Sequence, residues 1–340
     1  MPAQMERRSL IWIIVLVLVA YIMGTVGVYR ALMIGRTATV WDFYRLWYGA
    51  RVLLLEHRDP YDPQATLEMQ QALYGRPALI SEGQPAFYYP MPVLLLVAPF
   101  ALLPYPLAAS AWLCLLLFAV AAAVGVALWG LRWCVSPLGM AVLVLWALIL
   151  FPVLWSVLLG QIAALLLLPL NVGLAALLHK RDGLAGVCLA LTALKPQMVC
   201  LLLPMLVVWA LFNRCWYLLG ALVATLLALG GVSWLLLPVW PAHFLASVTR
   251  CATVSPFAAP LQILLEGWLG LPVRWLWIGV GIVLLGGCLA VWLLPQEGTK
   301  HIAWAASVTL IVSALIVPRI GMINQLNLLR PALTLVRRNC

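Results

Sequence analysis

Uninterrupted apolar runs of about 20 residues recur along almost the whole chain, and the first, built on IWIIVLVLVAYIM, covers residues 10–29. A helix rises 1.5 Å per residue, so a run of this length crosses the roughly 30 Å hydrocarbon core of a bilayer. The runs do not alternate apolar and polar residues, as the strands of a membrane barrel do. Because helices satisfy their own backbone hydrogen bonds in lipid, the sequence predicts an all-α bundle of transmembrane helices.

The composition excludes a soluble protein. Of the 340 residues, 66% are apolar and 9% are charged, whereas soluble domains carry roughly 25% charged residues. The net charge of +10 does not indicate nucleic-acid binding, because Arg and Lys lie in the gaps between apolar runs rather than beside aromatic base-stacking residues. The eight cysteines are scattered without metal or redox spacing, so we expect inert thiols.

The apolar runs predict about ten membrane spans within a single integral membrane domain, residues 1–340. The predicted spans cover residues 10–29, 107–131, 136–155, 158–178, 183–194, 196–212, 215–238, 273–294, 301–317 and 322–336. A shorter apolar segment at 91–103 is bounded and broken by Pro92, Pro99 and Pro104. Proline ends or kinks a helix, so this segment is expected to be re-entrant or to form a thin span.

The basic residues predict an orientation. Arg132, Lys180, Arg214 and Lys300 lie in alternate gaps between the apolar runs, and cytoplasmic loops of membrane proteins are enriched in such residues. We therefore expect both termini in the cytoplasm, and the loops 30–90 and 239–272 on the outer face of the cell (cytoplasmic) membrane. One alternative stays open: a single kinked helix over 183–212 would invert the sides of all that follows.

The loop at 30–90 is the only long polar stretch, and it holds six of the ten acidic residues. Two amphipathic helices are expected in it, at about 42–57 and 63–75, separated by the turn RDPY. Asp42 is the first acid after the first span and lies in the aromatic stretch WDFY. Two interpretations of Asp42 stay open: a cap for the helix that follows, or a functional carboxylate at the mouth of the membrane.

Lys195 is a second candidate, because it lies between two apolar runs. An ionisable side chain at membrane depth is costly, and it marks a functional site unless it snorkels to the interface. The next residue, Pro196, breaks the helix and frees backbone groups. An ammonium beside freed backbone groups suits a phosphate anion.

Three further polar residues lie at predicted turns. Gln161 ends the tripeptide LGQ at the start of a helix, where an interhelical hydrogen bond is its simplest role. Tyr89 belongs to FYYPMP, an aromatic entry into the membrane. Arg45 lies one turn beyond Asp42 and is expected to be solvated or to contact a donor. No Asp-x-Asp pair accompanies Asp42, so we expect neither a bound metal nor another cofactor.

Four stretches, in order, resemble glycosyltransferase family 87, a branch of the C-type (GT-C) membrane glycosyltransferases. In that family an Asp-Phe pair precedes an Asp-Pro-Tyr-Asp turn, a Tyr-Pro-Pro entry leads into a short helix, a Gly-Gln pair begins a helix, and a Lys-Pro pair breaks one. The corresponding stretches here are WDFYRLWYGARVLLLEHRDPYDP, FYYPMPVLLLVAPF, LLGQIAALLL and DGLAGVCLALTALKPQMVCLLLP.

The resemblance implies a GT-C fold and an inverting hexosyltransferase reaction. The donor would be a polyprenyl-phosphate sugar, often mannose, and a lipid or glycan would accept the sugar on the outer face. Asp42 would be the general base, and Lys195 and Arg45 would contact the donor phosphate. Gln161 and Tyr89 would support the site.

Two rival hypotheses remain from the sequence. A transporter or lipid flippase would also be polytopic, although such proteins often show inverted repeats and several intramembrane charges. A catalytically inactive protein of the same fold is the second rival. It is raised by the segment before the last run, where VPRI and INQ replace the Ser-Pro-His or Tyr-Asp that the family often carries.

Overall fold

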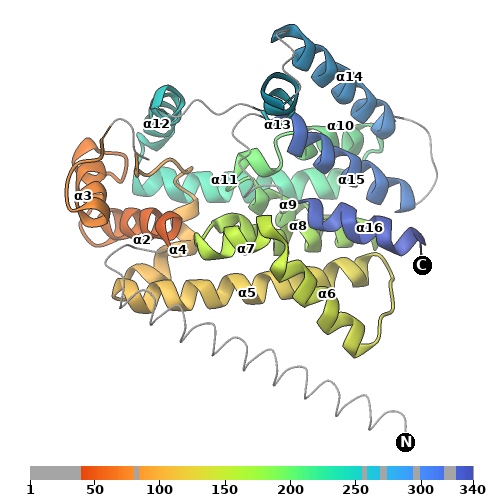
Figure 1. The fold of residues 1–340 in the computed structure, drawn as a ribbon, viewed down its shortest axis with the longest axis horizontal. Helices are drawn as coiled ribbons and strands as arrows, with labels where there is room; N and C mark the ends of the chain where they lie inside the picture. The colour runs from red at the N-terminus through yellow and green to blue at the C-terminus, as the bar shows by residue number, and fades with distance from the viewer. Residues whose placement is uncertain are drawn as a thin grey trace, which may run out of the picture. The chain divides into compact units, whose positions relative to one another are not determined.

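A computed structural model of the chain (Figure 1) describes residues 40–79, 84–254, 259–268, 274–293, 299–317 and 327–339. These residues form helices joined by turns, and no strand occurs among them, which confirms the all-α class. The first predicted span, residues 10–29, lies outside the described residues. So does the first part of the predicted span 322–336.

The first loop folds into the two expected helices, α2 (Trp41–Leu54) and α3 (Pro63–Tyr74). The side chain of Asp62 caps α3 by accepting a hydrogen bond from the backbone N–H of Gln64, and Pro63 occupies the first helical position, where its missing N–H costs nothing. Gly75 ends α3 in the left-handed region, at φ 72°. These local signals explain why the boundaries of α3 could be predicted from the sequence.

The proline-rich segment at 91–103 forms the short helix α4 (Val93–Ala101), which packs against α2. Its nine residues extend about 14 Å, less than half of a bilayer core. The segment is therefore short, as expected, and α4 alone cannot cross a membrane.

Three helices of the described residues are long and apolar enough to span a membrane by length and composition: α5 (Tyr105–Gly130), α11 (Trp216–Leu236) and α14 (Arg274–Leu293). A fourth candidate is the pair α6 (Pro137–Ile149) and α7 (Phe151–Leu158), which is bent by 68°. Pro152 stands in the first turn of α7 and has no N–H to continue α6. The predicted single run 136–155 is thus a broken span or a re-entrant pair.

The remaining apolar helices are shorter. They are α8 (Ile162–Leu178), α9 (Asp182–Thr192), α10 (Leu202–Phe212) and α15 (Thr299–Ile316). α9 and α10 have 11 residues each, about 16 Å, and the 3₁₀ turn η1 (Pro196–Met198) lies between them. The predicted break at Pro196 is confirmed, whereas the total of about ten spans stays a prediction.

The described residues of the predicted second outer loop, 239–272, are mostly helical. The loop contains α12 (Trp240–Val254), the single turn α13 (Pro260–Gln262) and the π-helical turn η2 (Ile263–Trp268). The last described helix is α16 (Leu329–Asn339).

The chain forms two compact units by its internal contacts. Unit 1 comprises residues 1–121, 135–165 and 229–255, and unit 2 comprises 122–134, 166–228 and 256–340. Within unit 2, α10, α14 and α15 pack on one another, and α16 packs on α15. Unit 1 carries Asp42, Arg45, Tyr89 and Gln161, whereas Lys195 belongs to unit 2. The single membrane domain over 1–340 stays a prediction.

Candidate functional site

An aromatic cluster fixes the first turn of α2. Phe43 is fully buried, and its ring stacks on that of Trp112 with 4.8 Å between the ring centroids. The hydroxyl of Tyr105 donates a hydrogen bond of 3.1 Å to the carbonyl of Val40. Because both anchors lie on α5, the start of α2 is held in a defined position beside that helix.

Gly160 allows the turn between α7 and α8 to pack closely against the start of α2. It adopts a left-handed conformation at φ 70°, and a Cβ on it would lie 2.2 Å from Cγ1 of Val40 and 2.7 Å from Cβ of Phe43. Glycine is therefore required there both by backbone conformation and by close approach. The indole N–H of Trp112 donates to the Gly160 carbonyl at 2.9 Å, and the N–H of Asp42 donates to the Leu159 carbonyl at 3.1 Å.

Asp42 is the centre of the contacts that result. Its side chain is buried, with a relative exposure of 5%. One carboxylate oxygen forms an ion pair with Arg45, and the other accepts a hydrogen bond from the side-chain amide of Gln161. Each carboxylate oxygen has two lone pairs, so each can still accept a hydrogen bond from a further donor.

The capping interpretation of Asp42 is wrong. Val40 occupies the cap position of α2, no side chain caps the helix, and Asp42 already lies in the first helical turn. The Asp42 carboxylate instead has two side-chain partners, Arg45 on α2 and Gln161 before α8, so it does not act as the start signal of α2.

Tyr89 and Tyr88 border the Asp42 network. The hydroxyl of Tyr89 is in hydrogen-bond contact with Gln161, and burial raises the pKa of Tyr89 while Arg45 and Gln161 act against that rise. The backbone carbonyl of Tyr89 accepts a hydrogen bond of 2.7 Å from Tyr61. Burial also raises the pKa of Tyr88, against the charges of Arg45 and Arg250.

A charged cluster ties α2 to α3 at the edge of the site. Arg58 contacts Glu68 at 2.9 Å and also pairs with Glu56. The hydroxyl of Tyr48 donates to Glu68 at 2.5 Å. Hydrogen bonds from Arg58 and Tyr48 lower the pKa of the Glu68 carboxyl to about 2, so Glu68 is ionised at any physiological pH.

The segment 239–272, which the sequence predicts to be a second outer loop, contacts the first loop through α12. The Nδ1 atom of His243, on α12, contacts the carboxylate of Asp59. The other oxygen of Asp59 accepts a hydrogen bond of 2.8 Å from the backbone N–H of Tyr61. Sequence reasoning assigned no role to His243 or Arg250, because neither belongs to a motif and 184 residues separate His243 from its partner.

Lys195 lies in the break between α9 and α10, directly before η1. Its relative exposure is 3%, so its side chain lies inside the protein and does not extend to solvent. Close to it in sequence, the carbonyl of Met198 accepts a hydrogen bond of 3.0 Å from Asn327. The role of Lys195 towards a donor stays a prediction.

Unit 2 also contains a buried cation that the sequence reasoning missed. Arg330, on α16, has a relative exposure of 1% and donates to the side-chain carbonyl of Asn171 at 3.1 Å. Its Nε and Nη2 atoms have no hydrogen-bond partner among the described residues. The signal was an arginine inside the run 322–336, since intramembrane charges mark functional positions by default.

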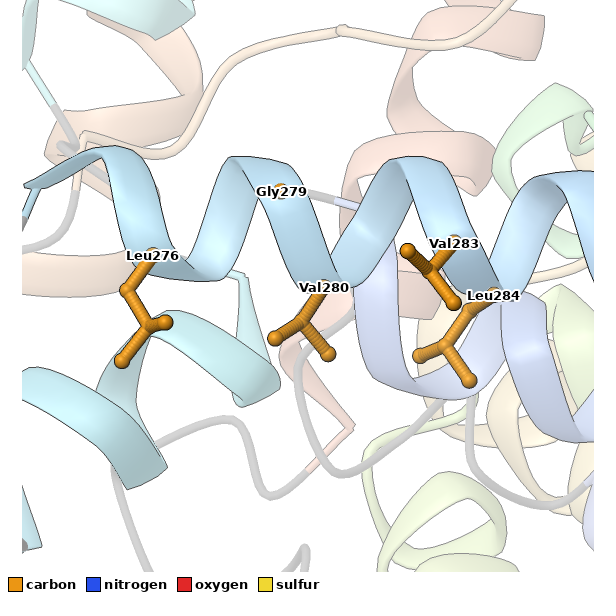
Figure 2. A pocket seen from close by; sticks show the side chains of 5 residues that line it. All are labelled: Leu276, Gly279, Val280, Val283 and Leu284. Carbon is orange, nitrogen blue, oxygen red and sulfur yellow. The ribbon is translucent and has the colours of Figure 1, made fainter.

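Among the described residues, neither a cluster of possible metal ligands nor the hollow on α14 gives a second polar site. Across the described ranges, no three His, Cys, Asp or Glu side chains gather as metal ligands. Figure 2 shows a hollow on α14 whose lining residues carry no polar side chain: Leu276, Gly279, Val280, Val283 and Leu284. Such a surface suits acyl chains and offers nothing to a phosphate or a sugar.

Comparison with known proteins gives one match. A model of glycosyltransferase family 87 matches residues 87–318, more than half of the chain. Tyr89, Gln161 and Lys195 lie inside the matched region, whereas Asp42 and Arg45 precede it. No curated protein matches the chain, and no solved structure does.

Proposed function

Because the chain belongs to glycosyltransferase family 87, we propose that it transfers a hexose, such as mannose, from a polyprenyl-phosphate donor to a lipid or glycan acceptor. The transfer takes place on the outer face of the cell membrane and inverts the anomeric carbon. The observation that carries this proposal is the buried carboxylate of Asp42, held between Arg45 and Gln161.

In the proposed reaction Asp42 is the general base. The acceptor hydroxyl loses its proton to the Asp42 carboxylate as its oxygen attacks the anomeric carbon. The bond between that carbon and the phosphate oxygen breaks, and the bonding electrons leave with the polyprenyl phosphate. The sugar is bonded to the acceptor, the proton is on Asp42, and the phosphate carries one more negative charge.

The neighbouring residues have distinct proposed roles. Arg45 balances the charge of the buried Asp42 carboxylate, which would otherwise be costly. A guanidinium has five N–H donors, so Arg45 can contact the donor phosphate as well. Gln161 orients the carboxylate, and Tyr89 holds Gln161. Lys195 is proposed as a further cation for the donor phosphate.

The contacts of unit 1 support a common side for the reacting groups. Asp42 contacts Gln161 and Asp59 contacts His243, which supports one side of a membrane for the first loop, the turn before α8 and α12. The basic residues in the other gaps favour the outer side for all three. A lipid-linked donor fits that side, because nucleotide sugars are made and kept in the cytoplasm.

The test is a transfer assay with the purified full-length protein. Synthetic polyprenyl-phosphate hexoses and nucleotide-linked hexoses are supplied in parallel, and free polyprenyl phosphate or nucleotide is measured. We expect release of polyprenyl phosphate only, with the opposite anomeric configuration in the product. Consumption of a nucleotide sugar instead would refute the proposed donor class.

A further inference from the structure

We propose that Arg330 of α16 binds the phosphate of the lipid-linked donor through one edge of its guanidinium group, inside unit 2. The inference rests on the proposed function and deepens it, because it assigns a phosphate contact to a residue that no sequence motif marks. Arg330, its hydrogen-bond partner Asn171 and the neighbouring Asn327 all belong to unit 2, so the site lies within one compact unit.

Arg330 is a buried cation that no acidic side chain balances among the described residues. Its relative exposure is 1%, and the ion pairs of the described ranges all involve other residues. A guanidinium keeps its proton in proteins, so Arg330 cannot become neutral. An unpaired charge inside a protein is costly, and an anion beside it offsets that cost.

The hydrogen bonding of Arg330 leaves one particular edge of the guanidinium open. Nη1 donates to the side-chain oxygen of Asn171 at 3.1 Å, whereas Nε and Nη2 have no partner among the described residues. An Nε–H and an Nη2–H bond point in the same direction along one edge of the group. Such an edge matches two oxygens of a single phosphate, in the paired arrangement that arginine favours. The contact with Asn171 therefore orients a site for an anion.

Asn327 adds an unpartnered acceptor one turn before Arg330. It is buried, with a relative exposure of 4%. Its side-chain amide donates to the Met198 carbonyl at 3.0 Å, but its side-chain oxygen has no partner within the described ranges. Residues three apart lie on one face of a helical turn. A ligand that satisfies both residues carries an anion and a hydrogen-bond donor, as a hexose phosphate does.

The contact with Met198 places the start of α16 at the helix break that carries Lys195. Met198 is the last residue of η1, and its own N–H donates to the Lys195 carbonyl at 2.9 Å. On the other side, Asn171 lies two residues before Gly173, where an added Cβ would lie 2.6 Å from Cγ of Leu189 on α9. The start of α16 therefore contacts both η1 and α8, and a phosphate bound there lies in the same part of unit 2 as the proposed cation.

The experiment measures ligand binding rather than turnover. Purified full-length protein in neutral detergent is titrated with polyprenyl phosphate and with the uncharged polyprenol of the same length. The phosphate preference is the ratio of the two affinities. We expect Arg330→Met to lower this preference by about tenfold or more, as for lost hydrogen bonds to a charged group. Arg330→Lys should lower it less, because lysine keeps the charge but lacks the paired edge.

Asn171→Asp tests the same site without removing the arginine. The new carboxylate takes the place of the amide oxygen that contacts Arg330, and it supplies a counter-charge from the protein itself. This variant should therefore lower the phosphate preference while the protein keeps its melting temperature, even if Arg330→Met fails to fold. Arg181→Met is the matched control: it removes the same charge from an exposed position of unit 2 and should keep the wild-type preference.

Inorganic phosphate distinguishes the two possible sources of the anion. We expect polyprenyl phosphate to stay bound in an excess of inorganic phosphate, because Arg330 is shielded from solvent. Displacement of the lipid by inorganic phosphate in the wild type, but not in Arg330→Lys, would overturn the lipid as the source.

The possible failures are distinguishable. If the wild-type protein shows no phosphate preference, the lipid-phosphate donor of the proposed function is wrong, and the role of Arg330 falls with it. If the wild type prefers the phosphate and Asn171→Asp, or a folded Arg330→Met, keeps the full preference, Arg330 does not bind the phosphate, and the proposed function is unaffected.

Discussion

The side-chain amide of Gln161 donates a hydrogen bond to the carboxylate of Asp42, although 119 residues separate the two in sequence. The contact joins the first turn of α2 to the start of α8. It connects a carboxylate that precedes the region matched by glycosyltransferase family 87 to a glutamine inside that region. Gln161, which lies in the region that matches the family, therefore contacts the proposed base.

This contact predicts the effect of changing Gln161. Gln161→Ala leaves one carboxylate oxygen without its donor, and it removes the group that Tyr89 contacts. We expect turnover to fall by roughly 10- to 100-fold, as for loss of a hydrogen bond to a charged group, with a smaller change in donor affinity. Steady-state kinetics at varied donor concentration would separate the effect on turnover from the effect on donor affinity. A pure loss of donor affinity would contradict an orienting role.

Gly160 provides a test of the packing that brings the two residues together. Gly160→Ala should destabilise the protein, because the new Cβ overlaps Val40 and Phe43 and the left-handed conformation disfavours alanine. Gly75→Ala is the matched control, since Gly75 is also left-handed but has open space around it.

The comparison isolates the steric overlap from the backbone strain that both variants share. The melting temperature in detergent should fall clearly more for Gly160→Ala than for Gly75→Ala, and transfer activity should fall only in Gly160→Ala. Equal melting temperatures for the two variants would show that the turn is not packed against α2 as described.

Glu68 predicts a pH dependence of stability. Its pKa is lowered from 4.5 to about 2 in the folded protein, chiefly by Arg58 and Tyr48. A carboxyl with a lowered pKa stabilises the fold above its unfolded pKa, and this contribution is lost as the pH falls from about 4.5 to about 2. The Glu68→Gln variant has no carboxyl, so it lacks this stabilising contribution at every pH. The difference in melting temperature between wild type and Glu68→Gln should therefore shrink between pH 6 and pH 3, and a constant difference would contradict the assigned ion pair.

Lys195 is the proposed cation of unit 2. Lys195→Ala should weaken use of a lipid-phosphate donor, because the phosphate loses a cationic partner at a site with little water. Lys195→Arg should restore part of the activity, since a planar fork replaces a point charge. The measurement is the KM for the donor together with kcat. Unchanged values of both in Lys195→Ala would leave Lys195 with a structural role.

The all-α class, the two helices of the first loop and the break at Pro196 could be predicted from local sequence signals. The helix over 63–75 was predicted from the turn RDPY that separates it from the helix before it, and the structure shows that Asp62-Pro63 and Gly75 bound it. Asp42, Gln161 and Lys195 were noticed because each is a polar residue at an apolar boundary. The break between α6 and α7 was missed, although Pro152 was its signal.

The remaining features depend on contacts between distant segments. The contacts of Asp42 with Gln161 and of Asp59 with His243 join separate helices, and no local pattern encodes such a pairing. Arg330 was overlooked because the apolar residues around it made the run look like an ordinary span.

The most direct measurement of the central claim is the turnover of Asp42→Asn with a polyprenyl-phosphate hexose. Asparagine keeps the size of the side chain and removes the basic oxygen, so kcat should fall by roughly 10²–10⁴. Asp62→Asn is the control: it removes the same charge from the same loop, and asparagine caps a helix about as well as aspartate, so this variant should keep full activity. A near-normal kcat for Asp42→Asn, in protein that folds as the wild type does, would contradict the assignment of Asp42 as the base.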